Sequence, residues 1–267
     1  MVVRAHQSGV ATFFGADLAN DPAGVDLGLV GLPTDVGLHQ RPGARYGPRA
    51  IRDASRMLRY QNVSTGVIPF DHARVADLGD PDLELFGLET IVGQIEEHYR
   101  GLRAAGVVPI TAGGDHSITY PILRALGDGR PLALVHLDAH YDTAPPMRGS
   151  AVHHCAPVLN AVNDGVVDPA RSIQVGMRDP WAEVESMCHP EGLTTLTTDE
   201  VVALGPAAVA ERIREVVGSG PVYVSFDVDV VETSPPWDPA GMTALTAAQA
   251  MFDLLCLAAE AHAARRG

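Results

Sequence analysis

The amino-acid sequence predicts an α/β fold of three layers, in which a mostly parallel β-sheet lies between two layers of helices. Short apolar runs recur along the chain without polar alternation, which is typical of strands that are buried on both faces. Helix-length stretches separate these runs over the whole sequence. This alternation is typical of parallel strands joined by right-handed helical crossovers. We expect a single domain over residues 1–267.

The predicted strands are short apolar runs with turn-forming residues on either side. In chain order they occupy residues 25–32, 74–78, 107–112, 132–137, 172–175, 193–196 and 222–226. The segment that precedes the first of them, residues 1–24, has a mixed composition and is expected to be irregular.

The predicted helices lie between these runs. Residues 84–105 have apolar side chains at helical spacing and end before Gly106, and residues 207–217 end before Gly218. Glycine is the residue most often found just after a helix end. Residues 118–126 follow a Gly-Gly turn, and the alanine-rich, amphipathic residues 246–264 form the last predicted helix.

Composition excludes several classes of function. The net charge of −14 and the pI near 5.1 argue against a nucleic-acid partner. The sequence has no lysine, which excludes Schiff-base chemistry and a phosphate-binding P-loop lysine. Its three cysteines (Cys155, Cys188 and Cys256) give no disulfide framework or zinc ribbon. We expect a cytoplasmic protein with no membrane-spanning run and no signal peptide.

Three motifs that can bind metal follow three of the predicted strands. They are Gly113-Gly114-Asp115-His116-Ser117, Asp138-Ala139-His140-Tyr141-Asp142 and Asp227-Val228-Asp229. Ligands of open α/β sheets bind at the carboxyl ends of the strands, where all three motifs fall. Alternate side chains of an extended segment point to one side, so we expect each Asp-x-His-x-Asp or Asp-x-Asp group to face one cleft.

The chemistry of these side chains favours divalent metal ions. Two imidazoles and four carboxylates form a ligand set without thiolate, which suits Mn²⁺ and leaves Zn²⁺, Co²⁺ or Ni²⁺ as substitutes. Two ions bridged by carboxylates would hold a water of lowered pKa as a nucleophile. Each motif alone is more often a solvated turn or a helix cap, but the three together favour metal-activated hydrolysis.

These motifs resemble those of the ureohydrolase (arginase and agmatinase) family, and the resemblance extends over nearly the whole chain. Gly31-Leu32-Pro33-Thr34-Asp35 and Arg41-Pro42-Gly43-Ala44-Arg45-Tyr46-Gly47-Pro48 are similar to the N-terminal signature of the family. Val175-Gly176-Met177-Arg178 is similar to one of its strand ends. The resemblance implies hydrolysis of a guanidino or amidino group at a binuclear manganese centre, with release of urea.

The resemblance also implies roles for individual residues. One Mn²⁺ would be held by His116, Asp138, Asp142 and Asp227, and the other by His140, Asp138, Asp227 and Asp229. Asp138 and Asp227 would bridge the ions, and Asp142 would also orient the attacking hydroxide.

The proton for the leaving amine would come from His154, on the loop after the second motif. Histidine suits this role because its pKa lies near the working pH. The glycine that usually follows it in the family is Cys155 here, and we expect His153 to have a structural role.

The sequence departs from the family after Asp229. Family members continue through a loop and a helix to a further strand, whose glutamate contacts the substrate guanidinium. Here the third motif runs directly into Val230-Val231-Glu232-Thr233-Ser234-Pro235, which resembles that later strand. We therefore predict an internal deletion of roughly 30 residues, the size of one strand–helix–strand unit. Glu232 is the candidate for the substrate contact.

Several alternatives remain open at this stage. Agmatine or a guanidino acid is favoured over arginine because the loop at residues 148–155 lacks the arginase pattern, and Arg148 could meet a substrate carboxylate. The protein could instead be a catalytically impaired metal-binding relative, or another metallohydrolase such as a deacetylase. The resemblance implies a homo-oligomer, a trimer or hexamer, with a small guanidino substrate. The charge and the short apolar runs predict no nucleic-acid or membrane partner.

Overall fold

The computed structural model describes residues 9–84, 86–127, 129–178, 189–227 and 242–266. All strand pairs in these residues are parallel, and they form two four-stranded ladders in the orders β1-β3-β2-β4 and β7-β6-β5-β8. The strands are β1 (Asp17–Leu18), β2 (Leu27–Leu32), β3 (Val75–Asp77), β4 (Val108–Gly113), β5 (Ala133–Leu137), β6 (Ile173–Met177), β7 (Thr194–Thr197) and β8 (Val222–Phe226).

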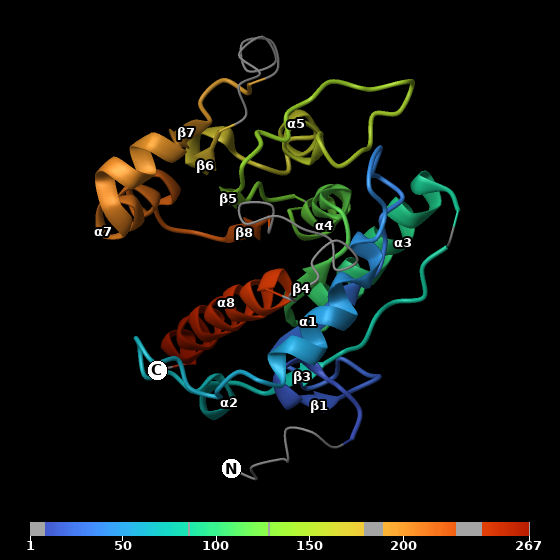
Figure 1. The fold of residues 1–267 in the computed structure, drawn as a ribbon, viewed down its shortest axis with the longest axis vertical. Coiled ribbons are helices and arrows are strands. Elements are labelled where there is room, and N and C mark those ends of the chain that lie inside the picture. The colour runs from blue at the N-terminus through green and yellow to red at the C-terminus, as the bar shows by residue number, and fades with distance from the viewer. Residues whose placement is uncertain (1–8, 85, 128, 179–188, 228–241, 267) are drawn as a thin grey trace.

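Helices cover both faces of each ladder, which confirms the predicted α/β architecture. They are α1 (Gly47–Ser55), α2 (Pro69–His72), α3 (Leu88–Ala104), α4 (Thr119–Leu126), α5 (Pro157–Asn163), α7 (Thr198–Val217) and α8 (Met242–Arg266). Figure 1 shows α7 and strands β5 to β8 in the upper half of the molecule, and α8, α1, β1, β3 and β4 in the lower half.

The apolar side chains divide by sheet face. Leu27 and Leu29 of β2 pack with α8 residues such as Phe252, whereas Val30 and Leu32 of the same strand pack with α3 and α4. In the second ladder, Ala133 and Val135 of β5 pack towards α7, and the other face packs on α4 and α5. All six residues of β2 are buried, which is why the strand lacks polar alternation.

Two sequence expectations need correction at the element level. The segment 1–24 is not wholly irregular, because β1 pairs with β3 as an added edge strand. The helix expected at residues 207–217 begins earlier, at Thr198, where Thr197 and Glu200 form a capping box. Gly205 has a φ of 76° and kinks this helix before Pro206, so the Gly-Pro pair marks a bend within it and not its start.

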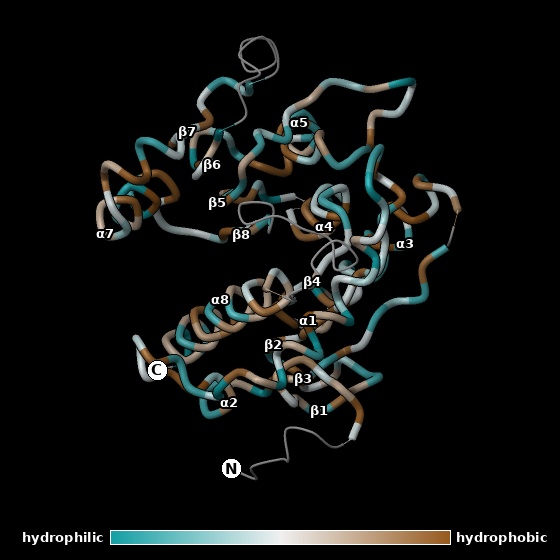
Figure 2. Tube along the Cα trace, viewed as in Figure 1, coloured by the Kyte–Doolittle hydropathy of each residue, from teal (hydrophilic) through white to brown (hydrophobic). Residues whose placement is uncertain are grey.

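Helix α8 is long and apolar enough to cross a membrane by length and composition alone, although no membrane-spanning run was expected. About half of its apolar residues are accounted for by burial, since 44 % of its most apolar stretch is buried in the protein. It packs on α1, α2 and β4, and Met251, Leu255 and Ala259 are buried in the core. In Figure 2 the helix is mainly brown or pale, with a few hydrophilic positions.

Candidate metal centre

The described parts of the three motifs meet at the carboxyl ends of β4, β5 and β8. Strand β4 ends at Gly113, β5 at Leu137 and β8 at Phe226, and each is followed within three residues by a candidate ligand. These ligands are His116, Asp138 and Asp227. Strands β5 and β8 are paired neighbours, so Asp138 and Asp227 emerge side by side.

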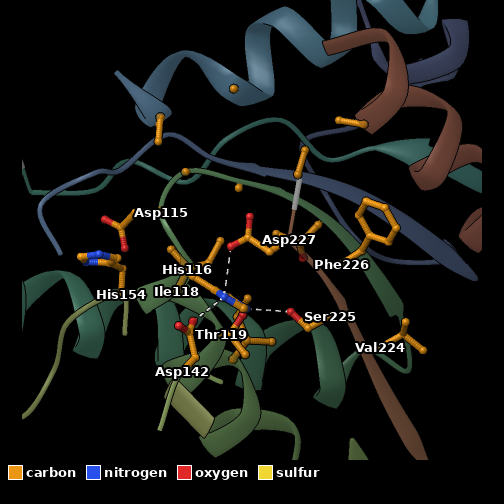
Figure 3. Close-up of a pocket in the computed structure, with 18 of the residues that line it drawn as sticks. Asp115, His116, Ile118, Thr119, Asp142, His154, Val224, Ser225, Phe226 and Asp227 are labelled. Atoms are coloured by element: carbon orange, nitrogen blue, oxygen red, sulfur yellow. Dashed lines mark hydrogen bonds and ion pairs between the residues drawn. The ribbon is translucent and has the colours of Figure 1, made fainter. Parts of the chain in front are cut away.

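His116 lies at the centre of this group. Its Nδ1 atom is 2.7 Å from Asp142 Oδ2, 3.2 Å from Asp227 Oδ2 and 3.3 Å from Asp138 Oδ2. Figure 3 shows His116 between Asp142 and Asp227, with Ser225 on the other side of its ring. The Nε2 atom of His116 is 2.8 Å from Ser225 Oγ and is placed to donate a hydrogen bond to it.

The environment of His116 is both buried and acidic. Burial alone would lower its pKa, but the carboxylates of Asp142, Asp138 and Asp227 outweigh burial and raise the pKa well above its usual value. Burial likewise raises the pKa of Asp142, against the opposing effect of His116. Three carboxylates this close together repel one another unless a positive charge lies among them. In the protein alone, that charge is the protonated imidazole of His116.

The geometry fits a divalent metal better than it fits a proton. Among the described residues, His116 Nδ1 is buried without a hydrogen bond of suitable geometry, although three carboxylate oxygens face it. An imidazole nitrogen and several carboxylate oxygens directed at one point form a first-row divalent metal site. His116, Asp138, Asp142 and Asp227 can therefore hold a metal ion.

Asp138 is oriented by a hydrogen-bond relay that no motif of the sequence indicates. His136 is fully buried, and its Nε2 atom lies 2.7 Å from Asp138 Oδ2. The Nε2 atom of Gln174 lies 3.0 Å from His136 Nδ1 and donates to it, so His136 donates from Nε2 to Asp138. The backbone N–H of His140 donates to the other oxygen of Asp138 at 2.7 Å. The available signal in the sequence was the position of His136 in β5, two residues before Asp138.

His140 and Asp142 reach the site differently from the extended arrangement predicted. An extended segment with side chains alternating between its two sides was expected over residues 138–142. Instead, strand β5 ends at Leu137, and the backbone bends back at Asp142, which has a φ of 50°. This left-handed turn brings Asp142 against His116. The side chain of His140 is 51 % exposed at the mouth of the site, with Nδ1 3.5 Å from Asp138 Oδ1. Asp229 and Glu232 lie outside the described residues.

His154 lies on the loop before α5, near the metal candidates. Its Nδ1 donates to the carbonyl of Gly37 at 2.9 Å, and its ring stacks on His39 with centroids 4.6 Å apart. The N–H of Gly37 donates to Asp115 at 2.9 Å, and a side chain at Gly37 would collide with Ser117. Gly37 therefore holds His154 and the Gly-Gly-Asp-His turn together, and Figure 3 shows His154 beside Asp115.

The neighbours of His154 have structural contacts. His153 is buried and donates from Nε2 to the Pro145 carbonyl at 3.2 Å, as its expected structural role requires. Cys155 is half-buried, and its Sγ lies within 4.8 Å of a ring nitrogen of both His39 and His154. His39 was not identified from the sequence, because one exposed histidine in a loop carries no pattern.

A cavity of about 780 Å³ opens at this site. His116, His140, Asp142, His154 and Asp227 line it at the end where the motifs meet. It continues between β4 and β8 to α8. Of the arginines in the described residues, Arg41 lines the cavity, whereas Arg148 does not. The fold and this arrangement define an α/β protein with a cluster of His and Asp side chains at the strand ends that could hold a metal ion.

Comparison with known proteins agrees with this class. A model of the arginase family matches residues 25–231. Guanidinopropionase of Pseudomonas aeruginosa is 37 % identical, over 96 % of this chain and 94 % of that protein. The human mitochondrial guanidino acid hydrolase is 34 % identical, over 93 % of this chain and 82 % of that protein. The protein belongs to the arginase family and is a hydrolase of that family.

Solved structures show the same relationship. Proclavaminate amidinohydrolase from Streptomyces clavuligerus superposes with a TM-score of 0.89 at 30 % identity, covering 97 % of this chain and 100 % of that one. A hypothetical agmatinase from Burkholderia thailandensis superposes with a TM-score of 0.88 at 32 % identity, covering 97 % and 94 % of the two chains.

Proposed function

We propose that the protein is a manganese-dependent amidinohydrolase that releases urea from a guanidino compound. Water adds to the guanidinium carbon, the bond from that carbon to the substituted nitrogen breaks, and urea and a protonated amine leave. The observation that carries the proposal is the convergence of three carboxylate oxygens on the orphaned Nδ1 atom of His116. Names of relatives such as guanidinopropionase and agmatinase support the guanidino substrate.

The proposed metal ligands follow the resemblance residue by residue. His116, Asp138, Asp142 and Asp227 hold one Mn²⁺, and His140 joins Asp138, Asp227 and Asp229 at the second. When bound, the ions supply a water whose pKa is lowered towards neutrality. The relay from Gln174 through His136 keeps one Asp138 oxygen fixed, and the N–H of His140 fixes the other. Ligands oriented in this way lose little freedom when metal binds.

His154 is the proposed proton donor to the leaving amine. Its Nδ1–H donates to the Gly37 carbonyl, so the opposite ring nitrogen, Nε2, is the atom that can exchange a proton with a substrate in the cavity. The stacked ring of His39 and the hydrogen bond to Gly37 fix the plane of the imidazole. A fixed ring lowers the entropic cost of proton transfer. Glu232 remains the candidate for the guanidinium contact.

A guanidino acid is the substrate class that we favour, with agmatine second and arginine third. Guanidinopropionase, guanidinobutyrase and guanidino acid hydrolases are among the relatives at 33–37 % identity. A guanidino acid carries a carboxylate, which Arg41 can meet within the cavity. Arg148, suggested by the sequence, lies outside the described cavity lining.

The decisive experiment is urea release from the purified, Mn²⁺-loaded protein. The panel is 3-guanidinopropionate, 4-guanidinobutyrate, agmatine and arginine, with His154→Ala as the loss variant and His72→Ala, which is exposed, as the matched control. Urea from one substrate, lost in His154→Ala and kept in His72→Ala, supports the proposal. A folded protein that retains manganese and releases no urea would support the second candidate, an impaired metal-binding relative.

That second candidate rests on the predicted deletion. The alignment to guanidinopropionase runs over 298 residues, whereas this chain has 267, so at least 31 aligned positions are gaps in this chain. The match to the arginase family ends at residue 231, at the predicted junction. We infer that relatives carry a segment there that this chain lacks. Sequencing the source DNA across codons 225–235 tests whether the junction is real.

Assembly and location are also proposals. A trimer or hexamer is expected from the family, and light scattering coupled to size exclusion measures it directly. A monomer would contradict this expectation. A cytoplasmic location is expected from the composition and is tested by cell fractionation of the source organism.

A further inference from the structure

A second group of metal-ligating side chains lies in the cavity and shares no residue with the group around His116. It consists of His39, His154 and Cys155, and one ligand atom of each residue lies within 4.8 Å of the other two. All three residues line the cavity. His39 is exposed, and His154 and Cys155 are half-buried, so the group lies where the cavity opens to solvent. We call it the mouth cluster.

Backbone hydrogen bonds hold the loops that carry the mouth cluster. The N–H of His154 donates to the Gly37 carbonyl at 3.2 Å, and Nδ1 of the same ring donates to it at 2.9 Å. The N–H of Ala144 donates to the Cys155 carbonyl at 2.8 Å. His39 follows Gly37 by two residues, and its ring stacks on that of His154. The three side chains are therefore held close together in advance, which lowers the entropic cost of binding a ligand.

The hydrogen bond to Gly37 also determines which nitrogen of His154 can bind a metal ion. A metal binds the ring nitrogen that carries a lone pair, and the N–H on the other nitrogen is commonly held by a backbone carbonyl or a carboxylate. Because Nδ1–H donates to Gly37, the lone pair of neutral His154 lies on Nε2. His154 therefore has the tautomer and the supporting hydrogen bond of a metal-ligating histidine.

The spacing of the mouth cluster suits a small tetrahedral ion. Zinc with nitrogen ligands at about 2.0–2.1 Å and a sulfur ligand at about 2.3 Å holds its ligand atoms roughly 3–4 Å from one another. The ring centroids of His39 and His154 are 4.6 Å apart, with 24° between the ring planes. Rotation of the exposed His39 side chain closes the cluster around an ion.

The thiol of Cys155 gives the mouth cluster a different metal preference from the group around His116. Thiolate and imidazole ligands suit Zn²⁺, whereas carboxylate ligands suit Mn²⁺. The affinity of a given site for divalent ions also rises from Mn²⁺ towards Zn²⁺. The group around His116 offers imidazole and carboxylate ligands. Zn²⁺ can therefore bind the mouth cluster while Mn²⁺ occupies the carboxylates.

We propose that His39, His154 and Cys155 bind one Zn²⁺ at the mouth of the cavity, with water in the fourth position. The thiol proton passes to solvent as the zinc–thiolate bond forms, and no group is oxidised or reduced. The ion occupies Nε2 of His154, the atom that the proposed reaction uses for proton transfer. Zn²⁺ is thus a reversible inhibitor that leaves the manganese in place, a consequence that rests on the proposed function.

The probe of the site is Co²⁺, which replaces Zn²⁺ in such sites and absorbs light. A Co²⁺–thiolate bond gives a near-ultraviolet charge-transfer band, which Co²⁺ bound by nitrogen and oxygen alone lacks. The full-length protein is loaded with Mn²⁺, freed of unbound metal and kept reduced, and Co²⁺ is then added in steps. We expect the band to saturate at one Co²⁺ per chain and to disappear when one equivalent of Zn²⁺ is added.

Variants assign the band to the mouth cluster. Cys155→Ser should abolish it, and Cys188→Ser, the matched control, should keep it. His39→Asn should weaken Co²⁺ binding at least about tenfold, because loss of a ligand costs more than loss of a hydrogen bond behind a ligand. His72→Asn, at an exposed position, should leave the affinity unchanged. Circular dichroism establishes that the variants are folded.

A measurement on the wild-type protein decides the matter if a variant does not fold. Iodoacetamide alkylates thiolates, and peptide mass spectrometry reports the rate at Cys155. A thiolate bound to a metal is withdrawn from this reaction, so Zn²⁺ should slow the alkylation of Cys155 severalfold or more. Mn²⁺ at the same concentration is the control and should leave the rate unchanged.

The inhibitory consequence has its own measurement. On a substrate that yields urea, Zn²⁺ should inhibit the Mn²⁺-loaded protein, and metal analysis should show that the manganese is retained. Cys155→Ala should keep the rate without zinc and raise the inhibitory Zn²⁺ concentration at least about tenfold. If no substrate yields urea, the proposed function fails, and the Co²⁺ and alkylation experiments still decide the zinc site.

The site would be overturned by the lack of a thiolate band in folded, reduced wild-type protein. A band that Cys155→Ser keeps, or an affinity that His39→Asn leaves unchanged, would also overturn it. Zn²⁺ that enters only by displacing manganese would do so too, because it would then occupy the group around His116. Equal zinc inhibition of wild type and Cys155→Ala, with manganese retained, would overturn the inhibitory role.

Discussion

The hydroxyl of Ser225 and the imidazole of His116 join the two ladders at the candidate metal centre. Ser225 belongs to β8 of one ladder, and His116 follows β4 of the other, yet Ser225 Oγ and His116 Nε2 are 2.8 Å apart. This contact fixes the ring so that Nδ1 faces the carboxylates. It also links the ends of two strands that belong to different ladders among the described residues.

Ser225→Ala should weaken metal binding without abolishing the fold. The change leaves His116 Nε2 buried without its partner, which costs about 1–3 kcal/mol. Loss of a hydrogen bond behind a metal ligand typically lowers metal affinity about 10–100-fold. Mn²⁺ titration and thermal unfolding measure the two effects, and Ser219→Ala, at an exposed position, is the matched control. Unchanged manganese affinity in a folded Ser225→Ala protein would contradict this role.

Gln174→Met tests the relay behind Asp138. The amide nitrogen of Gln174 donates to His136 and, at 2.6 Å, to the carbonyl of Tyr141. Methionine keeps the volume and removes the donor, so we expect about 1–3 kcal/mol of destabilisation and weaker manganese binding. The exposed Gln249→Met serves as the control for a change from glutamine to methionine. Equal manganese affinities in the two variants would show that the relay does not orient Asp138.

Asp35→Asn should destabilise the protein only above acidic pH. Burial would raise the Asp35 pKa, but the Arg45 side chain and the N–H of Gly43 together lower it. A pKa lowered on folding contributes stability above the unfolded value of about 3.9, and that stability is lost as the pH falls through the folded value.

We therefore expect Asp35→Asn to cost about 1 kcal/mol at neutral pH, a modest value because Arg45 is 41 % exposed. The difference from wild type should close below about pH 4. Urea unfolding at a series of pH values measures it, with Asp71→Asn, at an exposed position, as the control. A stability difference between Asp35→Asn and wild type that persists or grows at acidic pH would contradict the stabilising role of the Asp35 carboxylate.

Arg41→Ala separates the substrate classes. If a carboxylate substrate meets Arg41, its KM should rise about tenfold or more with a smaller change in kcat, since a charged hydrogen bond contributes about 1.5–3 kcal/mol. The KM for agmatine, which has no carboxylate, should not rise. Arg148→Ala is the matched control. A larger effect from Arg148→Ala would transfer the specificity role back to that residue.

Much of the fold followed from local patterns. The strand at residues 222–226 was predicted with the bounds that β8 has, and the strand at residues 107–112 differs from β4 by one residue. These runs are recognisable because strands buried on both faces contain few polar residues.

The remaining features depend on tertiary geometry that no local pattern encodes. His136 is a polar residue within a buried strand, and its role follows from Gln174 on a neighbouring strand. The turn at Asp142 depends on a φ of 50° that alternation does not predict. The division of the described strands into two ladders depends on which strands lie side by side, and the sequence shows only their order along the chain.

The central claim is that His116 and its carboxylates hold manganese, and metal analysis of the purified protein tests it most directly. Protein dialysed against Mn²⁺ and then freed of unbound metal should retain two ions per chain, measured by inductively coupled plasma mass spectrometry. We expect His116→Ala and Asp142→Asn to lower this ratio and His72→Ala to leave it unchanged. Wild-type protein that is folded and retains no manganese, zinc, cobalt or nickel would contradict the account.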